Sequence, residues 1–210
     1  MENKKNIKPE AVYEALENND EELALRLLDE GAPVIYMNEE NLTPLHLASK
    51  LGQARALRKL VALGHPVDAE SLFEVTPLHL AAARRKPETF KILLEMGANY
   101  QKIERDGWTP LHWASFRGCA PIIEMLVSLD GCGLNMKDND GWTPLHLAVA
   151  QEFPDRPVNP KAIEVLLKAG ADPAIENDIE QTPMELLNEL LEDAKEDVGL
   201  LAMKSLLEAA

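Results

Sequence analysis

Cysteine is scarce in this sequence, with two among 210 residues. A single pair cannot form the disulfide framework of a small secreted scaffold, so we expect free thiols and a reducing compartment, the cytoplasm. Long apolar runs are also missing. No stretch approaches the ~18 residues that a membrane-spanning helix needs, and the first ten residues lack the apolar core of a signal peptide. The sequence therefore predicts neither a disulfide scaffold nor a membrane protein.

Positive charge is in short supply as well. Lysine and arginine number 21 against 36 aspartates and glutamates, which gives a formal net charge of −15. Phosphate groups repel such a surface, so we expect neither nucleic acid nor an anionic membrane as a partner. Apolar residues make up 46% of the chain, which is enough to build a core. The composition indicates an acidic, soluble globular protein.

A short motif recurs along the chain at a nearly constant interval. The motif TPLHLAS and its variants, the last a diverged TPMELL, begin at Thr43, Thr76, Thr109, Thr143 and Thr182. The intervals are 33, 33, 34 and 39 residues. A glycine at the end of a leucine-rich segment stands 12 residues before each of these threonines, at Gly31, Gly64, Gly97, Gly131 and Gly170. Two markers with one common period indicate an internal repeat.

Each period predicts a helix, a turn and a second helix. A threonine such as Thr43 caps a helix start, and the proline after it loses no hydrogen bond in the first turn. The second helix presents apolar residues such as Leu57 and Leu60 on one face and ends at Gly64. Pairs such as Asp106-Gly107 favour a tight turn before the next threonine. One such unit cannot cover its own apolar face, so neighbouring units must stack.

In these motifs the sequence resembles the ankyrin repeat family along nearly its whole length. The resemblance implies an all-α solenoid of stacked helix–turn–helix repeats that carry β-turn fingers. We predict a flexible N-terminus at 1–8 and a single domain at 9–210, whose first and last repeats are caps. The six predicted repeats are 9–37, 38–70, 71–103, 104–137, 138–176 and 177–210. In this family the histidine of the motif is structural and bonds the neighbouring finger, which assigns that role to His46, His79, His112 and His146.

No residue pattern predicts catalysis, a metal or a cofactor. The motif histidines lie on stacked helices about 8–10 Å apart, whereas each zinc ligand must lie about 2.0–2.1 Å from the ion. Cys119 and Cys132 flank one helix at opposite ends, which places them too far apart for a disulfide. The glycines serve helix ends and turns and leave no phosphate-binding loop. We therefore expect a protein that is not an enzyme.

The repeat register predicts where a partner protein binds. In a solenoid of this kind the concave face is formed by finger residues one, three and four positions before each threonine and by first-helix residues seven and eight positions after it. Aromatic residues and arginine, which are enriched in binding hot spots, are frequent at these positions. The predicted partner-binding residues are Leu42, Lys50, Phe73, Val75, Arg84, Arg105, Trp108, Phe116, Arg117, Trp142 and Gln151. The alternative is that these rings only cover neighbouring fingers, whereas Trp113, in the place of Leu47, is expected in the core.

Two further features bear on the partner. The fifth repeat is six residues longer than the period, and the extra residues lie within 151–160, a stretch of ten residues that contains three prolines. This insertion is either a tolerated surface loop or part of a binding face. The second and third repeats gather basic residues that either favour an acidic segment of a partner or only balance the charge of a solvated surface, namely Lys50, Arg55, Arg58, Lys59, Arg84, Arg85 and Lys86.

The sequence thus predicts a monomeric, non-catalytic protein–protein interaction module that serves as an adaptor, scaffold or inhibitor and that binds an acidic or apolar segment through its concave face. One alternative is an effector that acts on a partner in a host cell. Another is a receptor for a peptide or small ligand, with the insertion near Phe153 and Arg156 as its site.

Overall fold

The computed structural model describes residues 7–150, 159–193 and 197–210. Within these residues the chain forms twelve α-helices and no β-strand. The helices are α1 (Ala11–Glu17), α2 (Glu21–Asp29), α3 (Pro44–Leu51), α4 (Ala54–Ala62), α5 (Pro77–Ala83), α6 (Pro87–Glu95), α7 (Pro110–Phe116), α8 (Ala120–Val127), α9 (Pro144–Val149), α10 (Pro160–Lys168), α11 (Pro183–Asp193) and α12 (Val198–Glu208). Two helices per repeat confirm the predicted all-α architecture.

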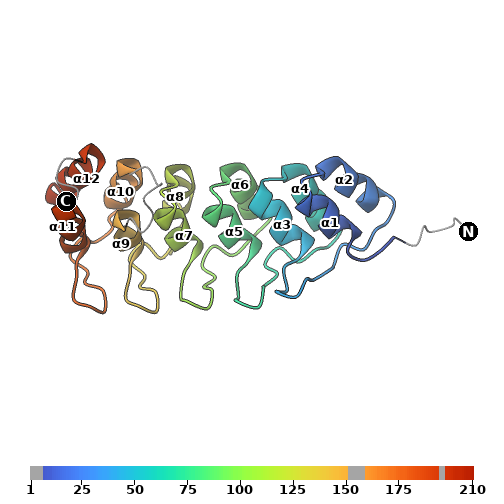
Figure 1. Cartoon of the computed structure of the whole chain (residues 1–210), viewed down its shortest axis with the longest axis horizontal. Coiled ribbons are helices and arrows are strands. Elements are labelled where there is room, and N and C mark those ends of the chain that lie inside the picture. The colour runs from blue at the N-terminus through green and yellow to red at the C-terminus, as the bar shows by residue number, and fades with distance from the viewer. Residues whose placement is uncertain (1–6, 151–158, 194–196) are drawn as a thin grey trace, which may run out of the picture. The chain divides into compact units, whose positions relative to one another are not determined.

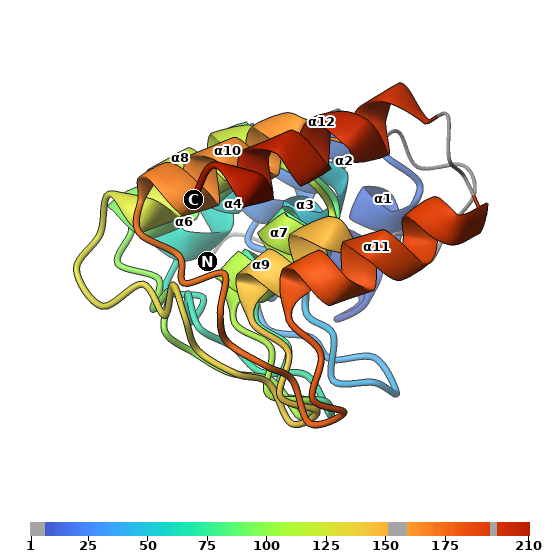
Figure 2. The ribbon, with the colours of Figure 1, turned by 90° about the vertical axis from the view of Figure 1, so that its left-hand side faces the viewer.

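The chain divides into two compact halves, Met1–Arg105 and Asp106–Ala210. In the N-terminal half α3 packs against α1 and α5, and α4 packs against α2 and α6, so first and second helices form separate layers (Figure 1). The C-terminal half is built the same way, with α7, α9 and α11 in one layer and α8, α10 and α12 in the other (Figure 2). In each half the fingers project beyond the layer of first helices.

The first helices begin where the Thr-Pro motif predicts. The side chain of Thr43 accepts a hydrogen bond from the backbone N–H of His46 (3.4 Å), and the ring of His46 accepts one from the backbone N–H of Thr43 (3.2 Å). This reciprocal capping box recurs at α5, α7 and α9, each with proline in the first turn. A cap of this kind stabilises a helix by about 1 kcal/mol.

Four of the second helices, α2, α4, α6 and α10, end two residues before the predicted glycine, whereas α8 ends four residues before Gly131. After α4, Gly64 adopts a left-handed φ of +95°, and its N–H donates to the carbonyl of Val61 (2.9 Å). The next amide, of His65, reaches back to the carbonyl of Leu60 (3.0 Å). These two bonds satisfy carbonyls that would otherwise be left without partners at the helix end.

The core lies between the two helix layers of each half. Leu45, Leu78, Phe90 and Leu93 have no exposed surface in the N-terminal half. In the C-terminal half the same holds for first-helix and second-helix residues such as Leu111, Ile122, Ile123, Leu126 and Leu166. Each side chain of this size contributes about 1.5–3 kcal/mol when it is fully buried.

Two predictions concern segments that lie largely outside the described residues. One is the flexible N-terminus at 1–8, of which residues 7 and 8 are described, and the other is the role of the insertion at 151–160, of which 159 and 160 are described. In the described part of the chain, no helix combines the length and the apolar character needed to cross a membrane.

Candidate partner-binding surface

The fingers are short hairpin turns that precede the Thr-Pro motif. In the finger Asp138–Trp142, the N–H of Asp138 donates to the carbonyl of Trp142 (2.9 Å). The carboxylate of Asp138 closes the turn by accepting from the N–H groups of Asp140 (3.0 Å) and Trp142 (2.8 Å). The same capping role, five positions before the motif threonine, is filled by Asn38, Ser71 and Asn177. The sequence analysis missed this position, although a short polar residue recurs there with the repeat period.

Neighbouring fingers are joined through their main chains. In the N-terminal half, the N–H of Leu72 donates to the carbonyl of Glu40 (3.0 Å), and the N–H of Arg105 donates to that of Phe73 (3.1 Å). In the C-terminal half, Asn139 bonds the carbonyl of Asp106 in the same way (3.1 Å). Backbone atoms therefore hold the fingers in register, and the side chains at their tips are not needed for this.

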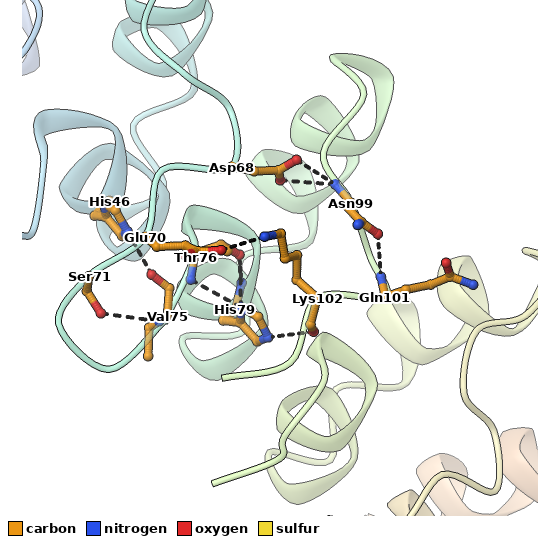
Figure 3. A network of polar contacts seen from close by, with 10 residues as sticks. All are labelled: His46, Asp68, Glu70, Ser71, Val75, Thr76, His79, Asn99, Gln101 and Lys102. Carbon is orange, nitrogen blue, oxygen red and sulfur yellow. Dashed lines mark hydrogen bonds and ion pairs between the residues drawn. The ribbon is translucent and has the colours of Figure 1, made fainter. Parts of the chain in front are cut away.

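The motif histidines tie each first helix to the next finger. The Nε2 of His46 donates to the carbonyl of Val75 (2.9 Å), and that of His79 donates to the carbonyl of Lys102 (3.1 Å) (Figure 3). His112 and His146 make the equivalent bonds to the carbonyls of Met136 and Gln181. The predicted structural role is confirmed, because both ring nitrogens are engaged in holding the fold.

These bonds define a neutral imidazole. Nδ1 of His46 accepts from the N–H of Thr43 and therefore carries no proton, while Nε2 carries the one it donates. Burial, which disfavours the charged ring, lowers the pKa of His46 to about 4. Burial also lowers the pKa of His112 and His146. None of these rings is free to bind a metal.

In the N-terminal half the predicted surface centres on Phe73 and Arg105. The ring of Phe73 is 48% exposed at the tip of its finger, and the guanidinium carbon of Arg105 lies 4.7 Å from the ring centroid. Arg105 is held there by a hydrogen bond from Nη2 to the carbonyl of Leu72 (2.8 Å). Of the other predicted residues, Arg84 is exposed, and the half-buried ones are Leu42, Lys50 and Val75.

The basic residues predicted to favour an acidic segment fall into two sets. On α4, Lys59 pairs with Asp29 (2.6 Å), Arg58 with Glu95 (3.7 Å), and Arg55 with Glu22, so these charges are locally compensated. A second set, at the ends of the first helices, forms no ion pair with another described residue and comprises Lys50, Arg84, Arg85 and Lys86. This second set leaves positive charge available to an acidic partner.

In the C-terminal half the predicted rings meet. Trp108, from the finger, lies edge-on to Phe116 at the end of α7, with 5.1 Å between ring centroids. Trp113 is half-buried and meets both rings edge-on, with ring centroids 4.7 Å from Trp108 and 6.3 Å from Phe116. Its expected place in the core is therefore wrong. The same position is half-buried at Leu80 of α5, whereas Leu47 of α3 and Leu147 of α9 are buried.

A pocket of about 190 Å³ lies beside these rings. It is lined by the aromatic residues Trp108, Phe116 and Trp142 together with the acidic residues Asp138 and Asp140. Leu147 and Ala150 complete its lining. We call this site the aromatic pocket. The structure thus brings together three of the predicted residues. Asp138 and Leu147 also line the pocket; they stand five positions before and four positions after Thr143, outside the register positions used for the prediction.

Two further predicted residues do not line the pocket. Arg117 follows α7 directly and is half-buried. Gln151 lies outside the described residues. Three of the predicted residues therefore line the aromatic pocket, and their role in binding a partner stays a prediction.

The cysteines and the acidic residues offer no reactive site in the described part of the chain. Cys119 and Cys132 are buried free thiols, as predicted, and burial raises the pKa of the Cys132 thiol. A thiol of this kind is a poor nucleophile because its thiolate is disfavoured. Among the described residues, no group of three or more His, Cys, Asp or Glu side chains could hold a metal ion.

Comparison with known proteins is consistent with the repeat geometry. No curated protein was found to match the chain. The family described as ankyrin repeats (3 copies) matches residues 11–103, 50–138 and 78–177, which overlap to span most of the sequence. Repeats of this family generally mediate contacts between proteins and are generally non-catalytic. Because the match extends over more than half of the sequence, the chain belongs to the ankyrin repeat family.

Proposed function

We propose that this protein is a non-catalytic interaction module that binds a partner protein through its fingers and first helices, as an adaptor, scaffold or inhibitor. The observation that carries the proposal is the gathering of half-buried rings at the aromatic pocket. Exposed aromatic surface costs solubility, and in repeat proteins it is typical of binding faces.

The fingers favour rigid docking. Each finger is closed by its own turn and tied to a neighbour through the main chain, so little chain entropy is lost when a partner binds. The exposed pair of Phe73 and Arg105 provides a second contact in the N-terminal half, and the uncompensated cations near it suit an acidic segment.

The remaining expectations form part of the same proposal. We propose a monomer that acts in the cytoplasm, where two free, buried cysteines stay reduced. We also propose that residues 9–210 fold as one domain. A separate ligand-receptor role for the insertion would rest on residues outside the described part of the chain, and no observation favours it.

The experiment is affinity capture with the tagged protein, compared with the double variant Trp108→Ala, Phe116→Ala. We expect partners captured by the wild type to be lost with the variant, because truncation of two central aromatic residues removes the hot spot. Far-UV circular dichroism confirms that the variant is folded. Equal recovery of the same partners by a folded double variant would contradict the proposed surface.

A matched control is the double variant Arg55→Ala, Arg58→Ala. These side chains lie on α4, away from the fingers, and both are engaged in exposed ion pairs. Exposed pairs of this kind contribute little to stability, so we expect the control to be folded and to retain its partners.

A further inference from the structure

We propose that the aromatic pocket receives one positively charged side chain, a lysine or an arginine, from a basic segment of the partner protein. This inference rests on the proposed function and specifies the chemistry of the partner. It follows from the shape, lining and charge of the pocket, and it distinguishes this site from the second set of basic residues in the N-terminal half, which suits an acidic segment.

The size of the pocket favours a side chain over a free small molecule. Its volume of about 190 Å³ corresponds to roughly six water molecules at ~30 Å³ each. Sites for drug-sized ligands usually measure about 300–1,000 Å³. The end of one long side chain is therefore the occupant that matches it.

The walls of the pocket favour a cation. Trp108, Phe116 and Trp142 present three aromatic rings, and the negative face of such a ring attracts an ammonium or guanidinium group. Trp142 is held in place through its backbone, whose N–H donates to Asp138 (2.8 Å), and Trp108 packs against Trp113 and Phe116. The rings are thus positioned before a ligand arrives.

The two carboxylates of the pocket complete the complementarity. Asp138 Oδ1 accepts two backbone hydrogen bonds, which hold the carboxylate in place at the lining of the pocket. Asp140 is exposed at the finger tip. The described residues that line the pocket include no lysine or arginine, so no basic lining residue neutralises Asp138 or Asp140. An apolar side chain would desolvate these carboxylates without pairing them, which is unfavourable.

The charge of the C-terminal half acts in the same direction. Residues 106–210 contain 7 lysines and arginines against 19 aspartates and glutamates, a formal charge of −12, whereas residues 1–105 carry −3. A field of this sign draws a basic segment toward the pocket and repels an acidic one.

The test uses the full-length protein and four capped pentapeptides of glycine with one central residue. The central residue is lysine, its neutral analogue norleucine, arginine, or its neutral analogue citrulline. All three tryptophans of the chain lie at or beside the pocket, so quenching or shift of their fluorescence reports occupancy directly. Isothermal titration calorimetry provides a second measurement.

We expect a charged peptide to bind roughly two- to thirtyfold more tightly than its neutral analogue, and more weakly as salt is raised. The lysine and arginine arms identify which cation is preferred. Binding that is equal for charged and neutral peptides would overturn the proposal and assign the pocket to an apolar side chain. Absence of binding by all four peptides at millimolar concentration would overturn it as well.

A matched pair of variants localises the effect. Asp140→Asn removes one pocket charge with little change of shape, and we expect it to weaken binding of the charged peptides roughly two- to fivefold. Glu124→Gln makes the same charge change at an exposed position on α8 that does not line the pocket, and it should leave their affinity unchanged. Equal losses in both variants would overturn the proposal, since only the overall charge would then matter.

These outcomes are separable from those of the capture experiment. If the peptides fail to bind while the double variant still fails to capture the partner proteins, the proposed function stands and the proposal of a cationic side chain in the pocket is wrong. If the charged peptides bind selectively but no protein depends on the rings, the pocket chemistry stands and the role as an interaction module is wrong.

Discussion

At the residue scale, the motif histidines are held by hydrogen bonds that require a neutral ring. Nδ1 of His46 accepts from the backbone of Thr43, and a proton there would turn that attraction into a clash of two donors. The ring is also fully buried. Its protonation in the folded state is therefore unfavourable, whereas in the unfolded chain the imidazole titrates near its ordinary pKa of about 6.5.

We predict that the protein loses stability as the pH falls from about 6.5 toward 4. The pKa of His46 is about 4 in the folded state, so between these values the unfolded chain binds more protons. The stabilisation is fully present above pH 6.5 and decreases by up to about 1.4 kcal/mol per pH unit for this ring. Urea unfolding at a series of pH values measures it.

The control for this prediction is the variant His46→Gln. It should be less stable at pH 7.5, because it loses the buried imidazole, and its stability should depend less on pH between 6.5 and 5. A free energy of unfolding that stays constant from pH 7 to pH 5 would contradict the assignment.

At the element scale, each finger turns through a left-handed residue two positions before the motif threonine. Glycine fills this position at Gly107 and Gly141, whereas Glu74 adopts it with φ of +61°. A Cβ atom on Gly141 would lie 2.3 Å from the carboxylate and 2.6 Å from the backbone nitrogen of Asp178 in the next finger. The left-handed backbone is therefore strained at Glu74, whereas at Gly141 the neighbouring finger leaves no room for a side chain.

Two substitutions at this position should act in opposite directions. Glu74→Gly relieves the strain of the left-handed backbone but also raises the entropy of the unfolded chain. We expect the free energy of unfolding to rise by about 0.5–1 kcal/mol in balance. Gly141→Ala introduces both strain and a clash, and we expect a loss of about 2 kcal/mol or more. Thermal or urea unfolding measures both. A stabilising Gly141→Ala would show that the fingers are not packed as described.

The elements also show how far sequence reasoning extends. Helix starts and ends were predictable because Thr-Pro and glycine act locally, through caps and backbone conformation. The pocket was not, because the register used for the prediction omitted the finger position of Asp138, five before the motif threonine, and the first-helix position of Leu147. Trp113 was placed in the core by analogy with Leu47, but Leu80, at the same position of α5, is half-buried as well. Local chemistry can be read from sequence, whereas the fit of large side chains depends on neighbours.

At the scale of the whole molecule, the continuous repeat period favours cooperative unfolding of the chain. The repeat interval from Thr76 to Thr109 is 33 residues, so the period continues unchanged past the end of the first half at Arg105. In repeat proteins each repeat is stabilised by its neighbours, which favours unfolding as one unit. This is the reason for proposing one domain over 9–210.

We predict that both halves unfold in a single transition. The tryptophans all lie in residues 106–210, so their fluorescence reports the C-terminal half alone, whereas far-UV circular dichroism reports both. The two urea curves should coincide. Leu57→Ala, at a fully buried site in the N-terminal half, should destabilise the protein by about 2–5 kcal/mol and move both curves together. A fluorescence curve that stays in place would contradict the single domain.

The main-chain ties between fingers have a consequence for how such a protein can change. The bond from Leu72 to Glu40 and the bond from Asn139 to Asp106 join peptide groups, whatever side chains those residues carry. Exchange of tip residues therefore alters what the molecule recognises while its framework is conserved. During evolution a protein of this architecture can acquire a new binding target through a few substitutions at the finger tips, and each intermediate sequence still folds.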